Sequence, residues 1–191
     1  VDEAVQLRKA GINLPIMVIN PSEEDLPNLV TYNIEPEIYS FVQLKVFSEF
    51  YMKKGIELKG HFTINTGMNR LGFDPEDLEA LVNELKHLHH VKVQSLYTHL
   101  AASDEAEHAD FSLQQLRTFK TYAEKVEQQL GIKTIKHALN SAGIVAYSEY
   151  QFDMVRLGIG LYGIEPCGNL QDELKSISTL KTVISQIRNV K

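Results

Sequence analysis

The feature that most constrains the fold is a regular alternation of short apolar runs with longer amphipathic segments along almost the whole chain. The apolar runs have the length of single strands, and the segments between them repeat apolar residues at helical spacing. In residues 75–88, for example, Leu78, Leu81, Val82 and Leu85 share one face of a helix. Strands joined by helices form a parallel sheet, so we expect an α/β protein. The predicted strands are residues 15–19, 37–41, 61–65, 91–99, 135–139 and 152–156.

Two architectures fit this alternation, an open doubly wound sheet and a closed barrel. A dinucleotide-binding open sheet carries Gly-x-Gly-x-x-Gly after its first strand, and no such motif follows residues 15–19. A (β/α)8 barrel of the TIM type normally takes about 250 residues and eight strands. Six strand–helix units are visible here. We therefore expect a partial barrel that lacks the first two strands, in a chain that begins at Val1 without methionine and is part of something longer.

The pattern changes after Pro166. Residues 1–165 hold the strand–helix units, whereas Cys167-Gly168-Asn169 is turn-like and residues 177–190 resemble β structure. We expect the barrel to occupy residues 1–165. Residues 166–191 are then a linker and the first strand of a C-terminal β domain.

Composition excludes several classes of function. The 191 residues carry 19 Lys+Arg against 25 Asp+Glu, a net charge of −6, which argues against a nucleic-acid partner. No apolar run approaches the roughly 18 residues that a membrane span needs. Cys167 is the only cysteine, which excludes an internal disulfide and a thiolate-rich metal site, and we expect no metal. No signal peptide opens the chain, so we expect a cytoplasmic protein.

Two segments offer groups that could hold a phosphate. Active sites of such barrels lie at the carboxyl ends of the strands, and the loops after the last two strands often bind phosphate. Residues 140–143, Asn-Ser-Ala-Gly, provide a hydroxyl and free amides at a helix start, and residues 158–160, Gly-Ile-Gly, provide further amides. The alternative is that both segments are ordinary strand-to-helix turns.

Three cationic or titratable side chains follow predicted strands. Arg156 ends an otherwise apolar strand, where it could meet an anionic ligand or a ring nitrogen, or form a structural ion pair with Asp153. His99 also ends a strand, as a functional or a purely structural residue. Arg70 follows a glycine-containing loop and could bind a carboxylate, or could be an ordinary surface arginine.

Four segments carry a more specific pattern. They are TGMNRLG at residues 66–72, THLA followed by SDE at residues 98–105, HALNSA at residues 137–142 and FDMVRLGIGLYG at residues 152–163. In this order and spacing they resemble the motifs D-T-G-M-x-R-L-G, T-H-F-A…A-D-E, H-x-x-N-S-A and F-D-x-V-R-P-G-I-x-L-Y-G of the alanine racemase family. The resemblance covers nearly the whole chain.

The resemblance implies a pyridoxal 5′-phosphate barrel, joined to a C-terminal β domain in a head-to-tail homodimer, that interconverts L-alanine and D-alanine for peptidoglycan synthesis. By position, Ser141, Gly158 and Ile159 would hold the cofactor phosphate, with Asn140 supporting this cradle. Arg156 would face the pyridine nitrogen. Because an arginine does not give up its proton, the ring nitrogen would stay unprotonated.

The resemblance also assigns roles on the substrate side. His99 would orient Arg156 and the base on the opposite face, and Arg70 would lie near the cofactor phenolic oxygen and the substrate carboxylate. Racemisation needs two bases. The family uses a Schiff-base lysine, in a motif like V-K-A-N-A-Y-G, and a tyrosine from the partner's C-terminal domain. Neither has a counterpart here, so we expect the isolated chain to be inactive and to bind the cofactor weakly.

Two departures from the family pattern bear on Arg70. Thr63 stands where the family often has a lysine, and Asn65 replaces the usual aspartate. Two alternatives therefore stay open beside a racemase: a non-catalytic pyridoxal-phosphate-binding barrel of cofactor homeostasis, and a degenerate barrel that has lost catalysis.

Overall fold

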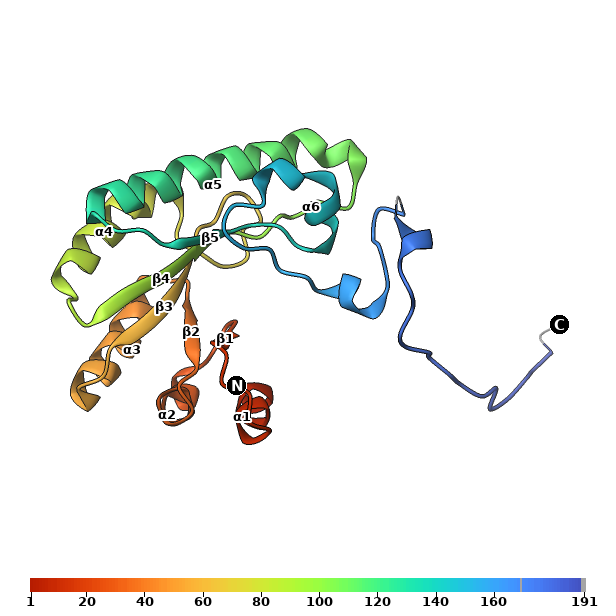
Figure 1. The fold of residues 1–191 in the computed structure, drawn as a ribbon, viewed down its shortest axis with the longest axis horizontal. Coiled ribbons are helices and arrows are strands. Elements are labelled where there is room, and N and C mark those ends of the chain that lie inside the picture. Colours follow the sequence, from red (N-terminus) through yellow and green to blue (C-terminus); the bar gives the residue numbers. More distant parts are fainter. Residues whose placement is uncertain (169, 190–191) are drawn as a thin grey trace.

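The computed structural model describes residues 1–168 and 170–189, and these contain one parallel sheet of five strands (Figure 1). The strands are β1 (Met17–Val18), β2 (Glu35–Ile38), β3 (Leu58–Thr63), β4 (Val91–Tyr97) and β5 (Ile135–His137). Each strand pairs in parallel with the next one along the chain. A doubly wound sheet reverses its strand order at a switch point, whereas a barrel keeps chain order around its wall. The sheet is therefore the curled wall of a partial barrel, as the sequence predicts.

The helix predicted for residues 75–88 is present as a 3-10 turn, Pro75–Asp77, followed by an α-helix, Leu78–His87. Gly55 and Gly131, both in the left-handed conformation, end the third and the fifth helix. In Figure 1, α3, α4 and α5 lie along one side of the sheet. The α-helices are α1 (Asp2–Lys9), α2 (Leu26–Thr31), α3 (Phe41–Lys54), α4 (Leu78–His87), α5 (Ala109–Leu130) and α6 (Ser141–Ala146). The 3-10 turns are η1 (Glu23–Asp25), η2 (Pro75–Asp77), η3 (Ala106–His108), η4 (Ser148–Tyr150), η5 (Ile159–Tyr162) and η6 (Gln171–Glu173).

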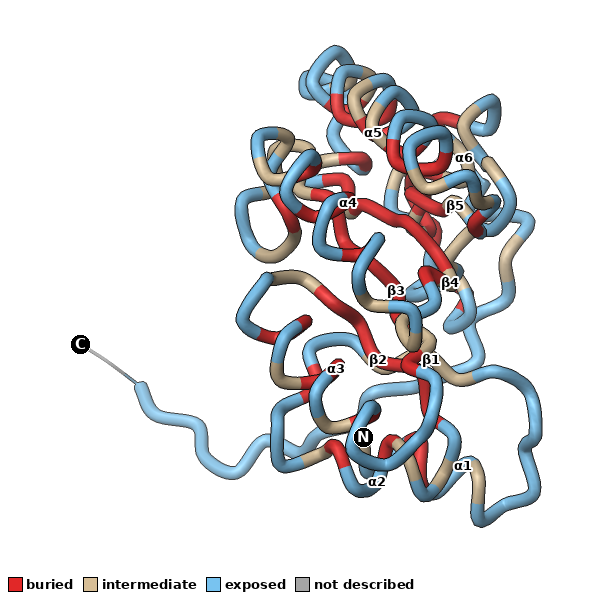
Figure 2. Tube along the Cα trace, turned by 90° about the vertical axis from the view of Figure 1, so that its left-hand side faces the viewer, coloured by how far each residue is buried: buried red, intermediate tan, exposed pale blue. Residues whose placement is uncertain are grey.

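The apolar core lies between the sheet and these helices. Phe62 of β3 and Leu96 of β4 are fully buried, as are Phe47 of α3 and Phe119 of α5. Figure 2 shows buried residues running along the strands, with exposed residues on the outer turns of the helices. Burial of this layer holds the helices against one face of the sheet.

The other set of strand side chains is polar and also buried. It comprises Glu35, Glu37, His61, Thr63, Ser95, Tyr97 and His137. A bulge aligns this set: Gly60 pairs with Val93 but His61 pairs with Ser95, so that Gln94 is an extra residue in β4. A regular ladder would pair His61 with Gln94, whose side chain lies on the opposite face from Ser95. The bulge therefore brings the polar side chains of β3 and β4 side by side.

The structure corrects several predicted strands; β3, for example, begins at Leu58, three residues before its predicted start. Residues 152–156 are not a strand, because they make a single bridge, Met154 to His137, and Phe152 has a φ of +49°. The segment still follows β5, since the Arg156 amide donates to the Leu139 carbonyl at 2.9 Å. The first strand is shorter than predicted and only half buried, and the second begins two residues earlier, at Glu35, whose carboxylate is paired in the interior.

The C-terminal segment leaves the body of the molecule (Figure 1). Residues 174–189 contain no helix or strand and are largely exposed, with Leu180 at 99%. The β structure predicted for residues 177–190 is therefore absent from the described part, and Val190 lies outside it, as do Asn169 and Lys191. Among the described residues, no helix has the length and apolar character to cross a membrane.

Candidate functional site

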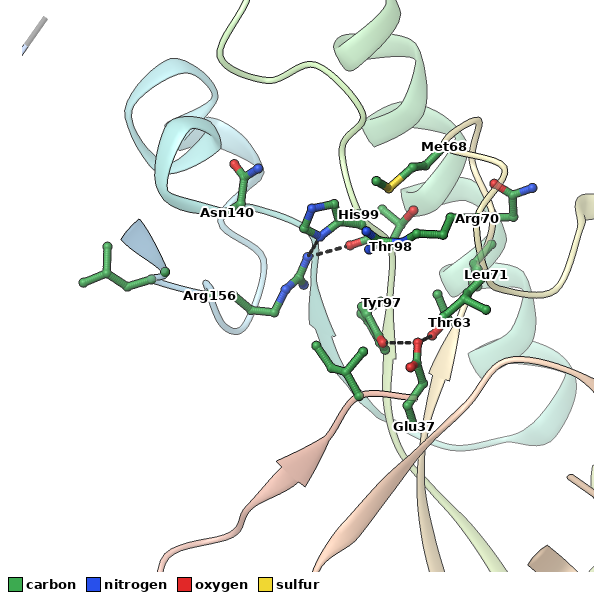
Figure 3. A pocket seen from close by; sticks show the side chains of 15 residues that line it. Glu37, Thr63, Met68, Arg70, Leu71, Tyr97, Thr98, His99, Asn140 and Arg156 are labelled. Atoms are coloured by element: carbon green, nitrogen blue, oxygen red, sulfur yellow. Dashed lines mark hydrogen bonds between the residues drawn. The ribbon is translucent and has the colours of Figure 1, made fainter. Parts of the chain in front are cut away.

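A pocket of about 250 Å³ opens where the strands end (Figure 3). It lies at the carboxyl ends of β2 to β5, the edge at which barrel enzymes carry their sites. Five of the seven predicted site residues line it, namely Arg70, His99, Asn140, Arg156 and Gly158. Its other polar lining residues are Glu37, Thr63, Asn65, Tyr97 and Thr98.

Arg156 is held on three sides. Its Nη1 donates to Nδ1 of His137 at 2.6 Å, and its Nη2 donates to the carbonyls of Thr98 at 2.8 Å and Ala138 at 3.0 Å. The guanidinium lies over the ring of Tyr97, 5.1 Å from its centroid. These contacts determine the plane of the guanidinium at the pocket wall.

Arg156 keeps donor capacity for a ligand. Five N–H bonds belong to a guanidinium, and within residues 1–168 and 170–189 one N–H on Nη1 and the N–H on Nε have no acceptor. Burial lowers the pKa of Arg156 to about 10, so the group is charged at neutral pH. The ion pair with Asp153 does not form, because Asp153 contacts Lys136 at 3.4 Å instead.

His99 is a neutral neighbour of this cation. Burial lowers its pKa to about 4, with further contributions from the charges of Arg156 and Arg70. Its Nδ1 lies 3.4 Å from Nη2 of Arg156, which can only donate, so the ring proton belongs on Nε2. His99 can therefore donate one hydrogen bond to a group on the far side of its ring. Arg70 lies exposed at the rim and makes no hydrogen bond to any described residue.

A second group of donors surrounds Ser141, at the first turn of α6. The amides of Gly158 and Gly160 both donate to its Oγ, at 3.0 and 3.1 Å. Ile159, predicted beside Gly158, supplies no such contact, and its side chain is exposed. Asn140 caps α6 by accepting from the Gly143 amide at 2.9 Å.

The glycines keep this cluster open. A Cβ at Gly160 would lie 2.7 Å from Cδ1 of Leu157 and 3.4 Å from Oγ of Ser141. A Cβ at Gly158 would lie 3.7 Å from the same hydroxyl. Two amides and a hydroxyl therefore meet in a space that side chains would fill, an arrangement that suits phosphate oxygens.

Glu37 lies in the pocket lining and was not predicted. Its Oε1 accepts hydrogen bonds from the hydroxyls of Tyr97 and of Thr63, the latter at 2.6 Å, and its Oε2 accepts from the Asn20 amide at 2.6 Å. Burial and the nearby carboxylate raise the pKa of Tyr97 well above its usual range, so this hydroxyl stays a donor. The sequence did contain a signal, because Glu35 and Glu37 are two residues apart and share one face of a strand. The predicted strand began at residue 37 and so excluded Glu35.

Asn65 organises the loop that carries Arg70. Its Oδ1 accepts from the amides of Gly67 and Asn69, and its Nδ2 donates to Oδ1 of Asp74 at 2.7 Å. An aspartate could accept the same amides but could not donate to Asp74. Asn65, which stands where the family motif has an aspartate, is therefore matched locally by Asp74.

A family model described as "Alanine racemase, N-terminal domain" matches residues 1–166. The chain belongs to the alanine racemase family. Among curated proteins, it is 33% identical over 192 residues to the alanine racemase of Synechocystis sp., covering 98% of this chain and 51% of that protein. It is 35% identical over 193 residues to that of Desulfovibrio desulfuricans, covering 99% and 52%. The chain thus spans about half the length of these relatives.

Solved structures of the family have the same fold. Alanine racemase from Clostridium difficile 630 in complex with cycloserine superposes with a TM-score of 0.82 at 29% identity, over 92% of this chain and 49% of that one. The enzyme from Bartonella henselae with covalently bound pyridoxal phosphate superposes with a TM-score of 0.78 at 29% identity, over 92% and 50%. The partial barrel is therefore the family's barrel.

Proposed function

We propose that this chain provides the cofactor-holding part of a pyridoxal 5′-phosphate-dependent alanine racemase. The observation that carries the proposal is the pair of polar groups at the carboxyl ends of the strands: the charged Arg156 lines the pocket, and the cluster around Ser141 adjoins it through Gly158. They suit the two ends of the cofactor, a ring nitrogen and a phosphate. Family membership supports the assignment.

When bound, pyridoxal phosphate stabilises negative charge at the substrate α-carbon. Arg156 would donate an N–H to the pyridine nitrogen and keep it unprotonated, which weakens the ring as an electron sink. A weaker sink suits a reaction that returns the proton to the α-carbon and avoids side reactions. The Ser141 hydroxyl would donate to the phosphate, with Ile159 as a further amide and Asn140 holding the helix start. The amides of Gly158 and Gly160 donate to Ser141 Oγ here and would exchange these bonds for bonds to the phosphate.

Two residues would act on the substrate side. Arg70, with no protein acceptor in the described chain, would bind the carboxylate of alanine. His99 would orient Arg156 through Nδ1 and a base on the opposite face through Nε2. No lysine lines the pocket among the described residues, so we expect the 191-residue chain to show no racemisation by itself.

The wider assignments rest on family membership. We propose that residues 1–165 are the cofactor barrel and that residues 166–191 are a linker and the first strand of a β domain. The exposed apolar side chains of Ile177, Leu180 and Ile184 support pairing with further β structure. We propose in addition a cytoplasmic homodimer that supplies D-alanine for peptidoglycan.

Calorimetric titration with pyridoxine 5′-phosphate tests cofactor recognition, because this analogue cannot form a Schiff base. We expect binding that weakens about tenfold in Ser141→Ala and in Arg156→Gln, since each loses hydrogen bonds to a charged or ring acceptor. Arg117→Gln, a change at an exposed arginine, should bind like the parent. Absence of binding would favour a degenerate barrel. Racemisation by this chain with added cofactor would contradict the expectation that it lacks the bases.

A further inference from the structure

A continuous chain of buried hydrogen bonds leads from the interior of the barrel wall to Arg156. Glu35 Oε2 lies 2.9 Å from His61 Nε2, and His61 Nδ1 lies 2.7 Å from Ser95 Oγ. Ser95 Oγ lies 3.1 Å from His137 Nε2, and His137 Nδ1 lies 2.6 Å from Arg156 Nη1. The four inner groups are at most 7% exposed and come from four neighbouring strands. Only the last member, Arg156, lines the pocket.

The two ends of this chain dictate the direction of every bond in it. A guanidinium can only donate, so His137 accepts on Nδ1 and carries its proton on Nε2. An ionised carboxylate can only accept, so His61 donates from Nε2 to Glu35, and the neutral tautomer that does so accepts on Nδ1. The single hydroxyl proton of Ser95 then points to His61, while its oxygen accepts from His137. Both ends require the same direction, and with both rings in their neutral form one arrangement of protons satisfies all four bonds.

Burial and charge support this arrangement. Burial, with the charge of Arg156, lowers the pKa of His137 to about 3, so the ring is neutral. Burial raises the pKa of Glu35, but the hydrogen bond from His61 and the charges of Lys59 and Lys92 outweigh burial and lower the pKa below its usual value, so the carboxyl is ionised. Because the His137 ring is neutral, it has one donor and one acceptor, as the hydrogen-bond chain requires.

The carboxylate is the member that removes the ambiguity. Histidine and serine can each run in either direction, so a chain without an acceptor-only end could reverse. A reversed chain would put a proton on Nδ1 of His137, facing a donor of Arg156. The guanidinium would then lose one of the three acceptors that hold its plane.

We propose that Glu35, acting through His61 and Ser95, holds His137 in the Nε2–H form and thereby positions the Arg156 guanidinium at the pocket. These are positioning residues, because none of them lines the pocket. The proposal deepens the proposed function, in which Arg156 meets the ring nitrogen. The hydrogen-bond chain itself can be tested without any cofactor.

The test is ¹⁵N NMR of the protein labelled at histidine and arginine. In the parent protein we expect His137 to be neutral with its proton on Nε2, and the Nη protons of Arg156 to exchange slowly. In Glu35→Gln and Ser95→Ala we expect about tenfold faster Nη exchange and about a tenfold larger Nδ1–H population, because a charged or buried link is lost. Ser95→Thr, which keeps the hydroxyl, should restore both signals. Glu127→Gln, a change at a buried carboxylate that is not part of the hydrogen-bond chain, should leave the Nη exchange rate and the Nδ1–H population unchanged.

Binding measurements separate this proposal from the function on which it rests. Glu35→Gln should weaken pyridoxine 5′-phosphate several-fold and leave the affinity for inorganic phosphate unchanged, because the Ser141 cluster is untouched. If the parent binds neither pyridoxine 5′-phosphate nor inorganic phosphate, the cofactor assignment is wrong. The NMR measurement still tests the hydrogen-bond chain independently. A protonated Nδ1 on His137 in the parent overturns the proposal, as do Arg156 exchange rates that both Glu35→Gln and Ser95→Ala leave unchanged.

Discussion

Replacing Tyr97 by phenylalanine removes the hydroxyl that donates to the buried Oε1 of Glu37 and leaves the ring in place beneath Arg156. Glu37 is 1% exposed and would keep only the donors from Thr63 and from the Asn20 amide. A hydrogen bond to a charged group contributes about 1.5–3 kcal/mol, because the partner left behind stays desolvated. We therefore expect the free energy of unfolding to fall by about 1.5–3 kcal/mol. For a chain of this size, the melting temperature should fall by roughly 3–12 °C.

Urea unfolding followed by far-ultraviolet circular dichroism measures this loss. The midpoint should shift while the slope stays constant, because the surface exposed on unfolding is the same. Tyr122→Phe is the matched control, since the Tyr122 hydroxyl makes no hydrogen bond to any described residue. If Tyr97→Phe and Tyr122→Phe unfold within about 0.5 kcal/mol of each other, the Glu37 contact does not stabilise the fold as argued.

Three further predictions follow from local geometry. Burial and neighbouring positive charge lower the pKa of His137 from 6.5 to about 3. Between pH 6.5 and pH 3, His137 is protonated in the unfolded chain but not in the folded one, so the free energy of unfolding should fall by about 1.4 kcal/mol per pH unit as pH falls. His137→Asn should reduce this pH dependence in urea unfolding. Asn65→Asp should set two carboxylates side by side and speed amide exchange in residues 66–70, with Asp74→Asn restoring protection. Gly72→Ala should lower the free energy of unfolding, measured in urea, by about 1–3 kcal/mol, because φ is +118° and a Cβ would lie 2.8 Å from the Asn65 backbone nitrogen. A loss below about 0.5 kcal/mol would contradict this geometry. Equal amide exchange in the parent and in Asn65→Asp would contradict the role given to Asn65.

Local patterns predicted helix α4 correctly and a strand at residues 152–156 wrongly. Apolar spacing over residues 75–88 located α4 to within a few residues, because this signal acts over one or two turns. Residues 152–156 have a strand-like composition, yet they make a single bridge to β5, and Phe152 at their start has a positive φ. Pairing depends on the neighbouring strand as well as on composition.

The site was predicted in part. Motif positions located Arg156, His99 and Ser141, and the fold brings them to one edge of the sheet. Glu37 was not predicted, because a carboxylate next to an apolar run is expected at the surface unless its hydrogen-bond donors are known. Gly160, rather than Ile159, supplies the second amide to Ser141, a detail set by the turn that begins at residue 159.

The parallel α/β architecture and the segments that follow the strands could be predicted from the amino-acid sequence, because periodicity and motif order are encoded locally. Which polar groups share the barrel interior depends on the three-dimensional fold. One extra residue in β4, Gln94, aligns His61 with Ser95, and that single step in register creates the buried path from Glu35 to Arg156. Register between strands far apart in the chain depends on how whole faces pack, and no short window of sequence contains that information.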